Sequence, residues 1–268
     1  MRYLPLGPDG PIVSQLGFGT GRLNGDLSAR KSARLVCSVR ELGITYFDTA
    51  PSYGLGDAER ILGATLEGDD QVVIATKVGL QWTRPPKWKR TALSARSLAA
   101  AQVRRSPLTR GVASPAATCP SPPDQFSPSR DQLMRSVDAS LRNLRRSCLD
   151  VLLLHDVHPA RVNDSTISAL EELVSTATIR AWGFGINAFM RNACEGSALW
   201  QTRWPSTPES DADAPATIYH GILRDSLRDG VQSPVQCLLS ATASRPGSVF
   251  LVSSNTRGHV ESLVGALG

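Results

Sequence analysis

Short apolar segments alternate with amphipathic helical segments along most of this 268-residue chain, and this alternation constrains its fold more than any other feature. The apolar segments lack the polar alternation of a half-exposed strand, which is typical of parallel strands covered on both faces. A repeated strand–helix order favours a parallel sheet that is flanked by helices or closed into a barrel. The predicted strands span residues 16–19, 44–47, 72–76, 150–154, 179–183 and 248–252.

The intervening helices carry start and stop signals. Ser28 is placed to cap a helix that runs to Leu42, and Gly43 is placed to end it. Between residues 128 and 146, apolar residues recur at the spacing of one helical face. Further helices are predicted at residues 57–66, 164–177, 233–244 and 258–267, and a hairpin is predicted at the N-terminus.

Two segments interrupt the alternation. Residues 79–125 contain seven prolines, so much of this Pro- and Arg-rich stretch is predicted to be loop. Residues 188–215 are rich in Ser, Pro, Asp and Ala and show no clear strand. Because the elements on both sides belong to one alternating series, residues 1–268 are expected to form a single domain.

The charge is unevenly distributed. The chain carries a net charge of +5, but residues 80–147 hold 13 Lys and Arg against three Asp, so this stretch is about +10 and the remainder about −5. A basic segment can attract an anionic partner. No nucleic-acid-binding motif accompanies it, which favours a solvated loop and helix face. A nucleic acid is therefore not expected as a partner. A membrane is not expected either, because no run of ~18 apolar residues is present.

The cysteines and histidines suggest neither a disulfide framework nor a metal site. Five scattered cysteines lack CxxC spacing and are interpreted as reduced thiols. His158, His220 and His259 lack partners at metal-ligand spacing. The N-terminus lacks the apolar core of a signal peptide, so a cytoplasmic location is expected.

Four side chains able to perform acid–base chemistry follow different predicted strands. Asp48, Lys77 and His155 each close a strand, and Tyr53 lies five residues after Asp48. In a parallel strand–helix barrel, these strand ends meet at the face where active sites form. Singly, each residue has a structural explanation, such as a helix cap for Asp48. Their joint placement favours an active site.

Each of these side chains has a predicted role. A free phenol has a pKa of ~10, which is too high for efficient proton transfer near neutrality. Lys77 is expected to lower the pKa of Tyr53, and Asp48 is expected to keep Lys77 charged and oriented. His155 is expected to donate a hydrogen bond to a substrate oxygen. The set can protonate a carbonyl oxygen while hydride arrives at carbon, or act in the reverse direction.

The segments around these residues carry a recognisable pattern. They are residues 17–20 (GFGT), 42–54 (LGITYFDTAPSYG), 75–79 (ATKVG) and 153–156 (LLHD). Together they resemble the aldo-keto reductases. The resemblance implies a (β/α)8 TIM-barrel fold, and it implies that Asp48, Tyr53, Lys77 and His155 form a catalytic tetrad. Residues 126–128, 137–141 and 183–187 are most similar to bacterial aldose (galactose or fucose) dehydrogenases and pyridoxal dehydrogenases.

The resemblance also implies a cofactor, NAD or NADP, and no metal. Asn187 would bind the nicotinamide carboxamide, and Gly19, Thr20 and Asp48 would lie near the cofactor. The candidates for the adenosine phosphate are Ser253, Ser254, Asn255 and Arg257. Ser253 and His259 stand where NADP-preferring relatives carry Lys and Arg, which favours NAD, although Arg257 could still meet a 2′-phosphate.

The segment between residues 187 and 233 departs from the family pattern. The sixth and seventh strand–helix units are not recognisable there, and Tyr219 is a poor match for the Tyr that stacks on nicotinamide in relatives. Removing the 47 residues of 79–125 leaves 221, against ~250 for a complete barrel. We therefore expect a TIM-barrel-type α/β fold that is shortened or incomplete.

Three functions follow from these observations. The first is an NAD(P)-dependent oxidoreductase that acts on a small carbonyl, alcohol or sugar-like substrate, contacted by Tyr53, His155 and Trp82. The second is a barrel with weakened cofactor binding that uses the same residues for an elimination or cyclisation in a biosynthetic pathway. The third is a silent binding subunit, which is disfavoured because it would not need all four tetrad residues. A homo-oligomer is left open.

Overall fold

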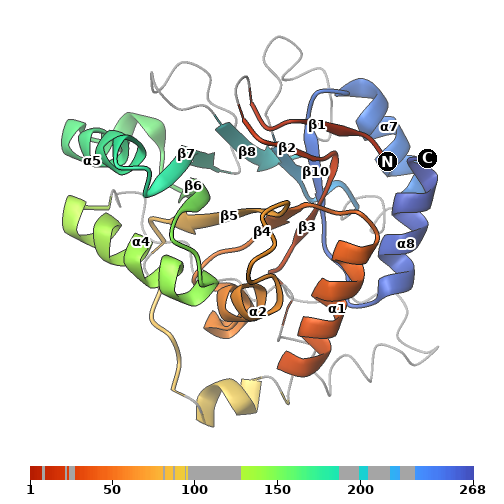
Figure 1. The fold of residues 1–268 in the computed structure, drawn as a ribbon, viewed down its shortest axis with the longest axis horizontal. Helices are drawn as coiled ribbons and strands as arrows, with labels where there is room; N and C mark the ends of the chain where they lie inside the picture. Colours follow the sequence, from red (N-terminus) through yellow and green to blue (C-terminus); the bar gives the residue numbers. More distant parts are fainter. Residues whose placement is uncertain are drawn as a thin grey trace.

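Eight parallel strands of the computed structural model form a closed barrel in the order β10-β3-β4-β5-β6-β7-β8-β9 (Figure 1). The structure describes residues 1–7, 10–21, 23, 28–80, 82–86, 88–93, 95, 128–186, 199–204, 218–223 and 233–268. The barrel strands are β3 (Leu16–Gly19), β4 (Tyr46–Asp48), β5 (Val73–Val78), β6 (Leu149–His155), β7 (Ile179–Gly185), β8 (Leu199–Arg203), β9 (Ile218–His220) and β10 (Val249–Val252). The TIM-barrel prediction is confirmed.

The prediction that the barrel is shortened was wrong. Strands β8 and β9 complete it: Gly185 of β7 pairs with Gln201 of β8, and Arg203 of β8 pairs with His220 of β9. β8 lies within residues 188–215, where no strand was expected. Its sequence gave no apolar run because buried Gln201 and Thr202 occupy its centre. β9 has only three residues, too few to show a pattern.

Helices surround the barrel (Figure 1). They are α1 (Ala29–Glu41), α2 (Ala58–Thr65), α4 (Arg130–Leu144), α5 (Asp164–Ser175), α7 (Pro234–Ser244) and α8 (Arg257–Ala266). Each lies within two residues of its predicted bounds. Ser28 caps α1 by accepting from Lys31 N, as predicted. Ser129 and Gln132 form a capping box that fixes the start of α4.

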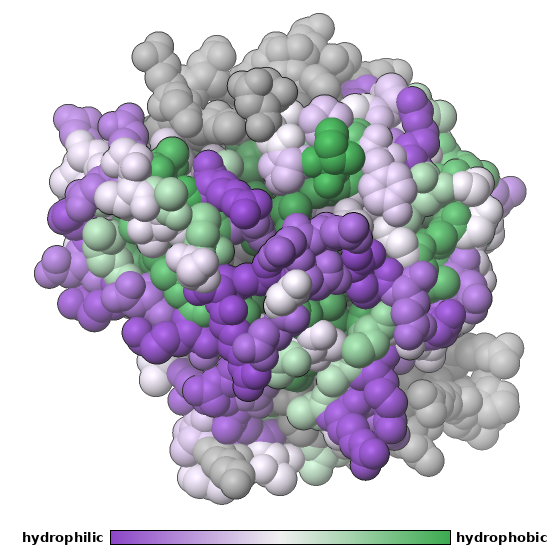
Figure 2. All heavy atoms as spheres, in the orientation of Figure 1, coloured by the Kyte–Doolittle hydropathy of each residue, from purple (hydrophilic) through white to green (hydrophobic). Residues whose placement is uncertain are grey.

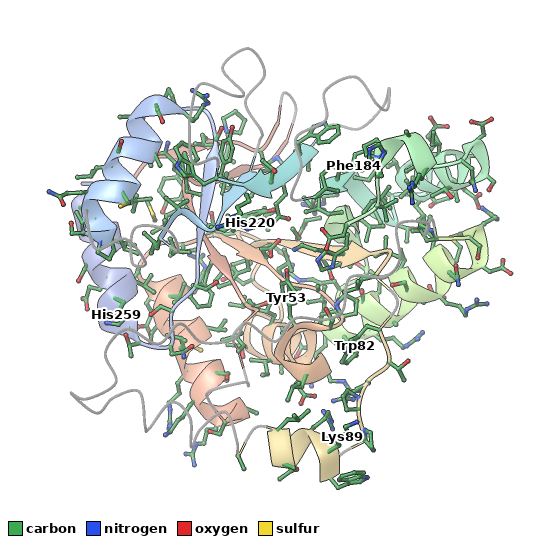
Figure 3. The ribbon with its side chains drawn as sticks, turned by 180° about the vertical axis from the view of Figure 1, so that it is seen from behind. Tyr53, Trp82, Lys89, Phe184, His220 and His259 are labelled. Carbon is green, nitrogen blue, oxygen red and sulfur yellow. The ribbon has the colours of Figure 1, made fainter. Side chains whose placement is uncertain are left out.

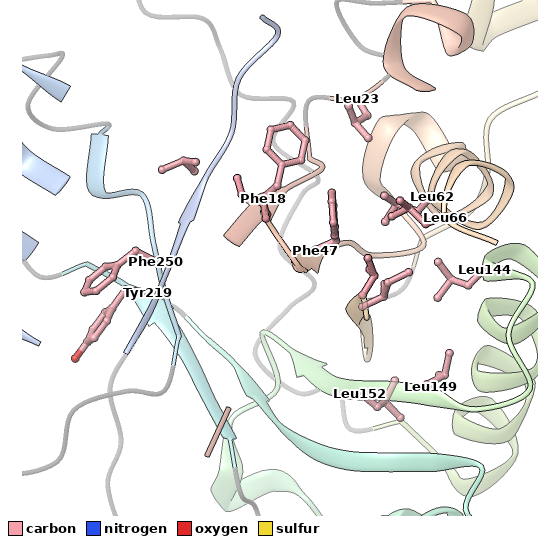
Figure 4. Packing of buried hydrophobic residues seen from close by; sticks show 14 of the residues in the cluster. Phe18, Leu23, Phe47, Leu62, Leu66, Leu144, Leu149, Leu152, Tyr219 and Phe250 are labelled. Atoms are coloured by element: carbon pink, nitrogen blue, oxygen red, sulfur yellow. The ribbon is translucent and has the colours of Figure 1, made fainter. Parts of the chain in front are cut away.

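The barrel strands bury side chains on both faces, as a parallel sheet under helices requires. Outward side chains such as Phe47 and Leu152 form one cluster with helix residues such as Leu62 and Leu144 (Figure 4). Alternate side chains, such as Tyr46 and Leu153, point into the barrel and form a second cluster. This alternation along each strand decides which residues reach the barrel mouth.

A hairpin covers the amino-terminal end of the barrel. Strands β1 (Tyr3–Pro5) and β2 (Ile12–Ser14) pair in antiparallel fashion, as predicted. Their buried residues Leu4 and Val13 cluster with side chains of the barrel interior. The surface on this side is largely hydrophilic, with scattered apolar side chains (Figure 2). The hairpin leaves open the opposite, carboxyl end of the strands, where the sequence predicts the active site.

The predicted loop at residues 79–125 is described only in part. Residues 82–86 are irregular and residues 88–93 are helical, whereas residues 96–127 lie outside the described residues. No helix in the described ranges is long and apolar enough to cross a membrane. In those same ranges, Cys37, Cys148 and Cys237 form no disulfide.

Glu59 fixes the start of α2 against its neighbours. This buried carboxylate accepts hydrogen bonds from Thr76 Oγ1 of β5 (2.7 Å), Ser140 Oγ of α4 (2.8 Å) and Asn143 Nδ2 of α4 (3.0 Å). A buried carboxylate with this many donors is well satisfied. The helix that follows the Tyr53 loop is therefore held in place independently of that loop.

Candidate active site

The four predicted catalytic residues meet at the carboxyl end of the barrel. Asp48, Lys77 and His155 lie at or next to the ends of β4, β5 and β6, which are neighbours in the barrel. Tyr53 begins the short 3-10 helix η1 (Tyr53–Gly56) after β4. Figure 3 shows Tyr53 near the middle of this end, with His220 close by in the view.

Lys77 and Asp48 form a buried ion pair. Their side chains are only 3% and 4% exposed, and Lys77 Nζ also donates to Thr49 O at 3.0 Å. Burial lowers the pKa of Lys77, and the Asp48 carboxylate acts in the opposite direction. Two hydrogen bonds fix the ammonium, so it is oriented as expected.

Tyr53 lies between Lys77 and His155. Lys77 Nζ is 5.2 Å from the centroid of the Tyr53 ring, a cation–π contact, and the Tyr53 and His155 rings meet edge to face at 6.1 Å. Burial raises the pKa of Tyr53 above its usual value, and the carboxylates of Asp48 and Asp156 raise it further. The pKa of Tyr53 is therefore raised, not lowered as the sequence predicted, and the phenol keeps its proton near neutral pH.

His155 is a neutral imidazole in this environment. Burial lowers its pKa to about 3, and the electrostatic influence of Lys77 and His220 acts in the same direction. A neutral ring carries one N–H donor and one acceptor nitrogen. It can therefore donate a hydrogen bond to a substrate oxygen without adding a charge.

This low pKa makes the stability depend on pH. In the unfolded chain His155 has a pKa of ~6.5, so between pH 6.5 and 3 the unfolded state binds the proton and the folded state does not. The free energy of unfolding therefore falls as the pH drops through this window. Between pH 7 and 5, the free energy of unfolding of the native protein should fall by about 2 kcal/mol more than that of the His155→Gln variant. Urea unfolding at both pH values measures this, and a pH-independent difference between the two proteins would contradict it.

Gln201 is a site residue that the sequence did not indicate. Its Nε2 donates to Asp48 Oδ1 at 3.0 Å, so Asp48 is held by both Lys77 and Gln201. His220, for which the sequence predicts no metal-binding role, ends β9 and contributes to the lowered pKa of His155. Both residues come from the two strands that showed no pattern, which is why they were missed.

The residues predicted to bind cofactor lie at the same end. Ser253, directly after β10, donates its hydroxyl to Gly19 O at 2.8 Å. A Cβ atom on Gly19 would lie 2.8 Å from that hydroxyl oxygen, so a larger residue here would displace the Ser253 side chain. The Thr20 hydroxyl donates to Asp48 O at 2.9 Å. Gly19, Thr20 and Ser253 therefore join the ends of β3, β4 and β10.

The other residues predicted to contact the cofactor lie in different surroundings. Ser254 donates to Thr256 O at 3.0 Å in the loop before α8. Arg257 pairs with Glu41 of α1 at 2.8 Å on the surface. Asn255 lies between them, and Asn187 lies outside the described residues. Tyr219 points away from the mouth: it is fully buried and packs on Trp204 and Phe250.

The mouth has features that fit a nicotinamide dinucleotide. The buried Gln201 Oε1 has no hydrogen-bond partner among the described residues, so it can accept a bond from a bound amide. Neutral backbone and hydroxyl groups of Gly19 and Ser253 line the adjoining strand ends. The described residues contain no group of three or more His, Cys, Asp or Glu that could hold a metal ion.

Comparison with known proteins identifies the family. The model of the aldo/keto reductase family matches residues 15–195, which include the whole tetrad. The chain belongs to the aldo/keto reductase family. This agrees with the resemblance seen in the sequence.

Individual aldo/keto reductases and related enzymes are also similar. Pyridoxal 4-dehydrogenase of Microbacterium luteolum is 32% identical over 72% of this chain and 58% of its own length. A 6-dehydroglucose reductase of Novosphingobium aromaticivorans is 27% identical over 68% of this chain and 50% of its own length. The chain thus spans about half the length of the curated relatives it matches.

Solved structures of the family share the fold. An aldo-keto reductase of Bacillus halodurans, solved in a holo form, superposes with a TM-score of 0.72 at 21% identity and covers all of this chain and 91% of its own. A glycerol dehydrogenase of Gluconobacter oxydans superposes with a TM-score of 0.67 at 18% identity, covering 98% and 88% of the two chains. At these identities the likeness shows the fold alone.

Proposed function

We propose that this aldo/keto reductase is an NAD(P)-dependent oxidoreductase that interconverts a carbonyl and an alcohol, with Tyr53 as the proton donor and acceptor. The observation that carries the proposal is the buried Lys77–Asp48 pair, with Tyr53 over its ammonium and His155 against the Tyr53 ring. A Tyr that keeps its proton, held beside a cation and a neutral imidazole, suits protonation of a carbonyl oxygen.

Each residue of the tetrad has a part in the proposed reaction. His155 donates a hydrogen bond to the carbonyl oxygen and orients it toward Tyr53. As negative charge develops on that oxygen, Tyr53 transfers its proton, and the Lys77 ammonium stabilises the phenolate that forms. Asp48 and Thr49 O hold Lys77 in position. The bound nicotinamide would supply or accept the hydride.

Two groups of residues are proposed to hold the dinucleotide. Gln201 would bind the nicotinamide amide together with Asn187, near Gly19, Thr20 and Asp48. The loop after β10 would bind the adenosine phosphate through Ser253, Ser254, Asn255 and Arg257. The pairing of Arg257 with Glu41 favours NAD, because a 2′-phosphate would have to compete with a carboxylate for that guanidinium.

The proposed substrate is a small aldehyde or a sugar-like molecule. The names of the two relatives, pyridoxal 4-dehydrogenase and 6-dehydroglucose reductase, support this class. His155 is only 15% exposed, which suits a small ligand whose reacting oxygen reaches into the barrel mouth. Trp82 is proposed to lie along the substrate side. A cytoplasmic location and a homo-oligomer stay predictions.

The proposal is tested by titrating the protein with NADH and NADPH while recording tryptophan fluorescence and calorimetric heat. Binding of at least one dinucleotide at roughly micromolar to sub-millimolar concentration is expected. Turnover is then assayed across aldehydes, sugars and lactols with the cofactor that binds. Absence of binding by both methods would reject the redox function and favour a non-redox use of the tetrad.

A further inference from the structure

Asp57 occupies the N-cap position of α2 but does not cap it. The carboxylate of a capping Asp normally accepts from backbone N–H groups of the first turn. The Asp57 side chain makes no such bond. Its oxygens instead accept from Arg90 Nη1 at 2.9 and 2.7 Å and from Arg84, and both arginines belong to the segment after β5.

The turn that Asp57 ends has an unfavourable backbone. Gly54, Leu55 and Gly56 all have positive φ angles, of 59°, 57° and 86°. Two of these positions suit glycine, but Leu55 has a side chain that disfavours this conformation. Non-glycine residues stay in such a conformation only where surrounding contacts enforce it. The turn lies between Tyr53 and Asp57, so those contacts act on the proposed proton donor.

The enforcing contacts come from two sides. On the inner side, a Cβ atom at Gly54 would lie 2.5 Å from Leu23 O, so Gly54 packs directly on the backbone of the β3–α1 connection. On the outer side, a Cβ atom at Gly56 would lie 2.4 Å from the Trp82 ring. The Trp82 ring therefore packs against Gly56, and the two arginines bind Asp57 at the end of the turn.

We propose that Trp82, Arg84, Arg90 and Asp57 form a clamp that holds the strained turn and thereby positions Tyr53 for catalysis. The clamp residues are positioning residues and act through Asp57 and Gly56. The catalytic part of the proposal rests on the proposed function. The structural part, that the clamp holds the turn, does not depend on it.

The structural part is tested by hydrogen exchange of the turn. In the double variant Arg84→Ala/Arg90→Ala, amides between residues 53 and 57 should exchange at least tenfold faster, because the bond from Asp57 N to Gly54 O (3.3 Å) opens more often. The rest of the barrel should exchange as before, since Glu59 holds α2 separately. Arg130→Ala is the matched control, because it breaks a surface pair with Glu172 far from the turn.

The catalytic part is tested by kinetics and by rescue. In the double variant kcat should fall at least tenfold, with little change in KM for the dinucleotide. Leu55→Asn should restore most of the lost kcat in that background, because Asn tolerates a positive φ angle and the turn then needs no clamp. In the otherwise native protein, Leu55→Asn should leave kcat nearly unchanged.

The outcomes separate the two proposals. Unchanged exchange in the double variant would overturn the clamp. Faster exchange with unchanged kcat, or a loss of kcat that Leu55→Asn does not restore, would overturn its role in positioning Tyr53. If the native protein binds no dinucleotide, the proposed function fails, and the exchange experiment still decides whether the clamp exists.

Discussion

Tyr53→Phe should lower turnover by about 10²–10⁴-fold, the range that general acid catalysis usually contributes. Phe keeps the ring that faces Lys77 and His155, so the cation–π and edge-to-face contacts persist. Only the phenolic hydroxyl is lost, together with the proton that it transfers. KM for the dinucleotide should stay within a few-fold, because Tyr53 is not among the residues proposed to hold it.

The measurement is steady-state turnover of the native protein and the variant with the same substrate. Circular dichroism and thermal unfolding provide the control that the variant is folded. His155→Gln is a useful companion, since it removes the orienting imidazole but leaves the phenol. Turnover in Tyr53→Phe equal to that of the native protein would refute the assignment of the proton donor.

Lys77→Met should destabilise the fold by about 3–5 kcal/mol and also abolish turnover. The substitution leaves the Asp48 carboxylate buried with Gln201 and no cation, and an uncompensated buried charge carries this penalty. Urea unfolding measures the loss, provided the slope of free energy against urea is unchanged.

A double variant separates the cost of the unpaired buried charge from the cost of lost packing. In Asp48→Asn/Lys77→Met both charges are removed, so most of the lost stability should return while turnover stays absent. If the double variant is as unstable as Lys77→Met, the penalty comes from packing around the Lys77 side chain and the electrostatic account is wrong.

The sequence predicted those parts of the protein whose local signals are strong. Ser28 marks a helix start that the structure reproduces, and the apolar spacing of residues 128–146 marks α4. Asp48, Lys77 and His155 follow apolar strands, so strand polarity alone brought them to one end of the barrel. Periodicity and capping are local properties, and they could be interpreted without knowledge of the tertiary structure.

The missed parts depend on tertiary contacts. β8 carries polar residues that are buried only because the barrel closes around them, and Gln201 meets Asp48 only because the barrel brings two distant strands together. The pKa of Tyr53 was expected to fall because Lys77 was considered alone. Burial and two carboxylates reverse the direction, and none of these is visible from sequence spacing.

The hydrogen bond from Gln201 to Asp48 has a consequence for how the barrel can be redesigned. β8 and β4 are four strands apart in either direction around the barrel, so this hydrogen bond crosses the barrel interior from one side to the other. We expect substrate to react on the side of this hydrogen bond that faces the carboxyl ends of the strands. Side chains on its other side, such as Tyr46 and Leu199, belong to the hydrophobic cluster inside the barrel. Substitutions in this cluster should change the thermal stability of the protein. Substitutions between the hydrogen bond and the carboxyl ends of the strands should instead change which substrate is turned over.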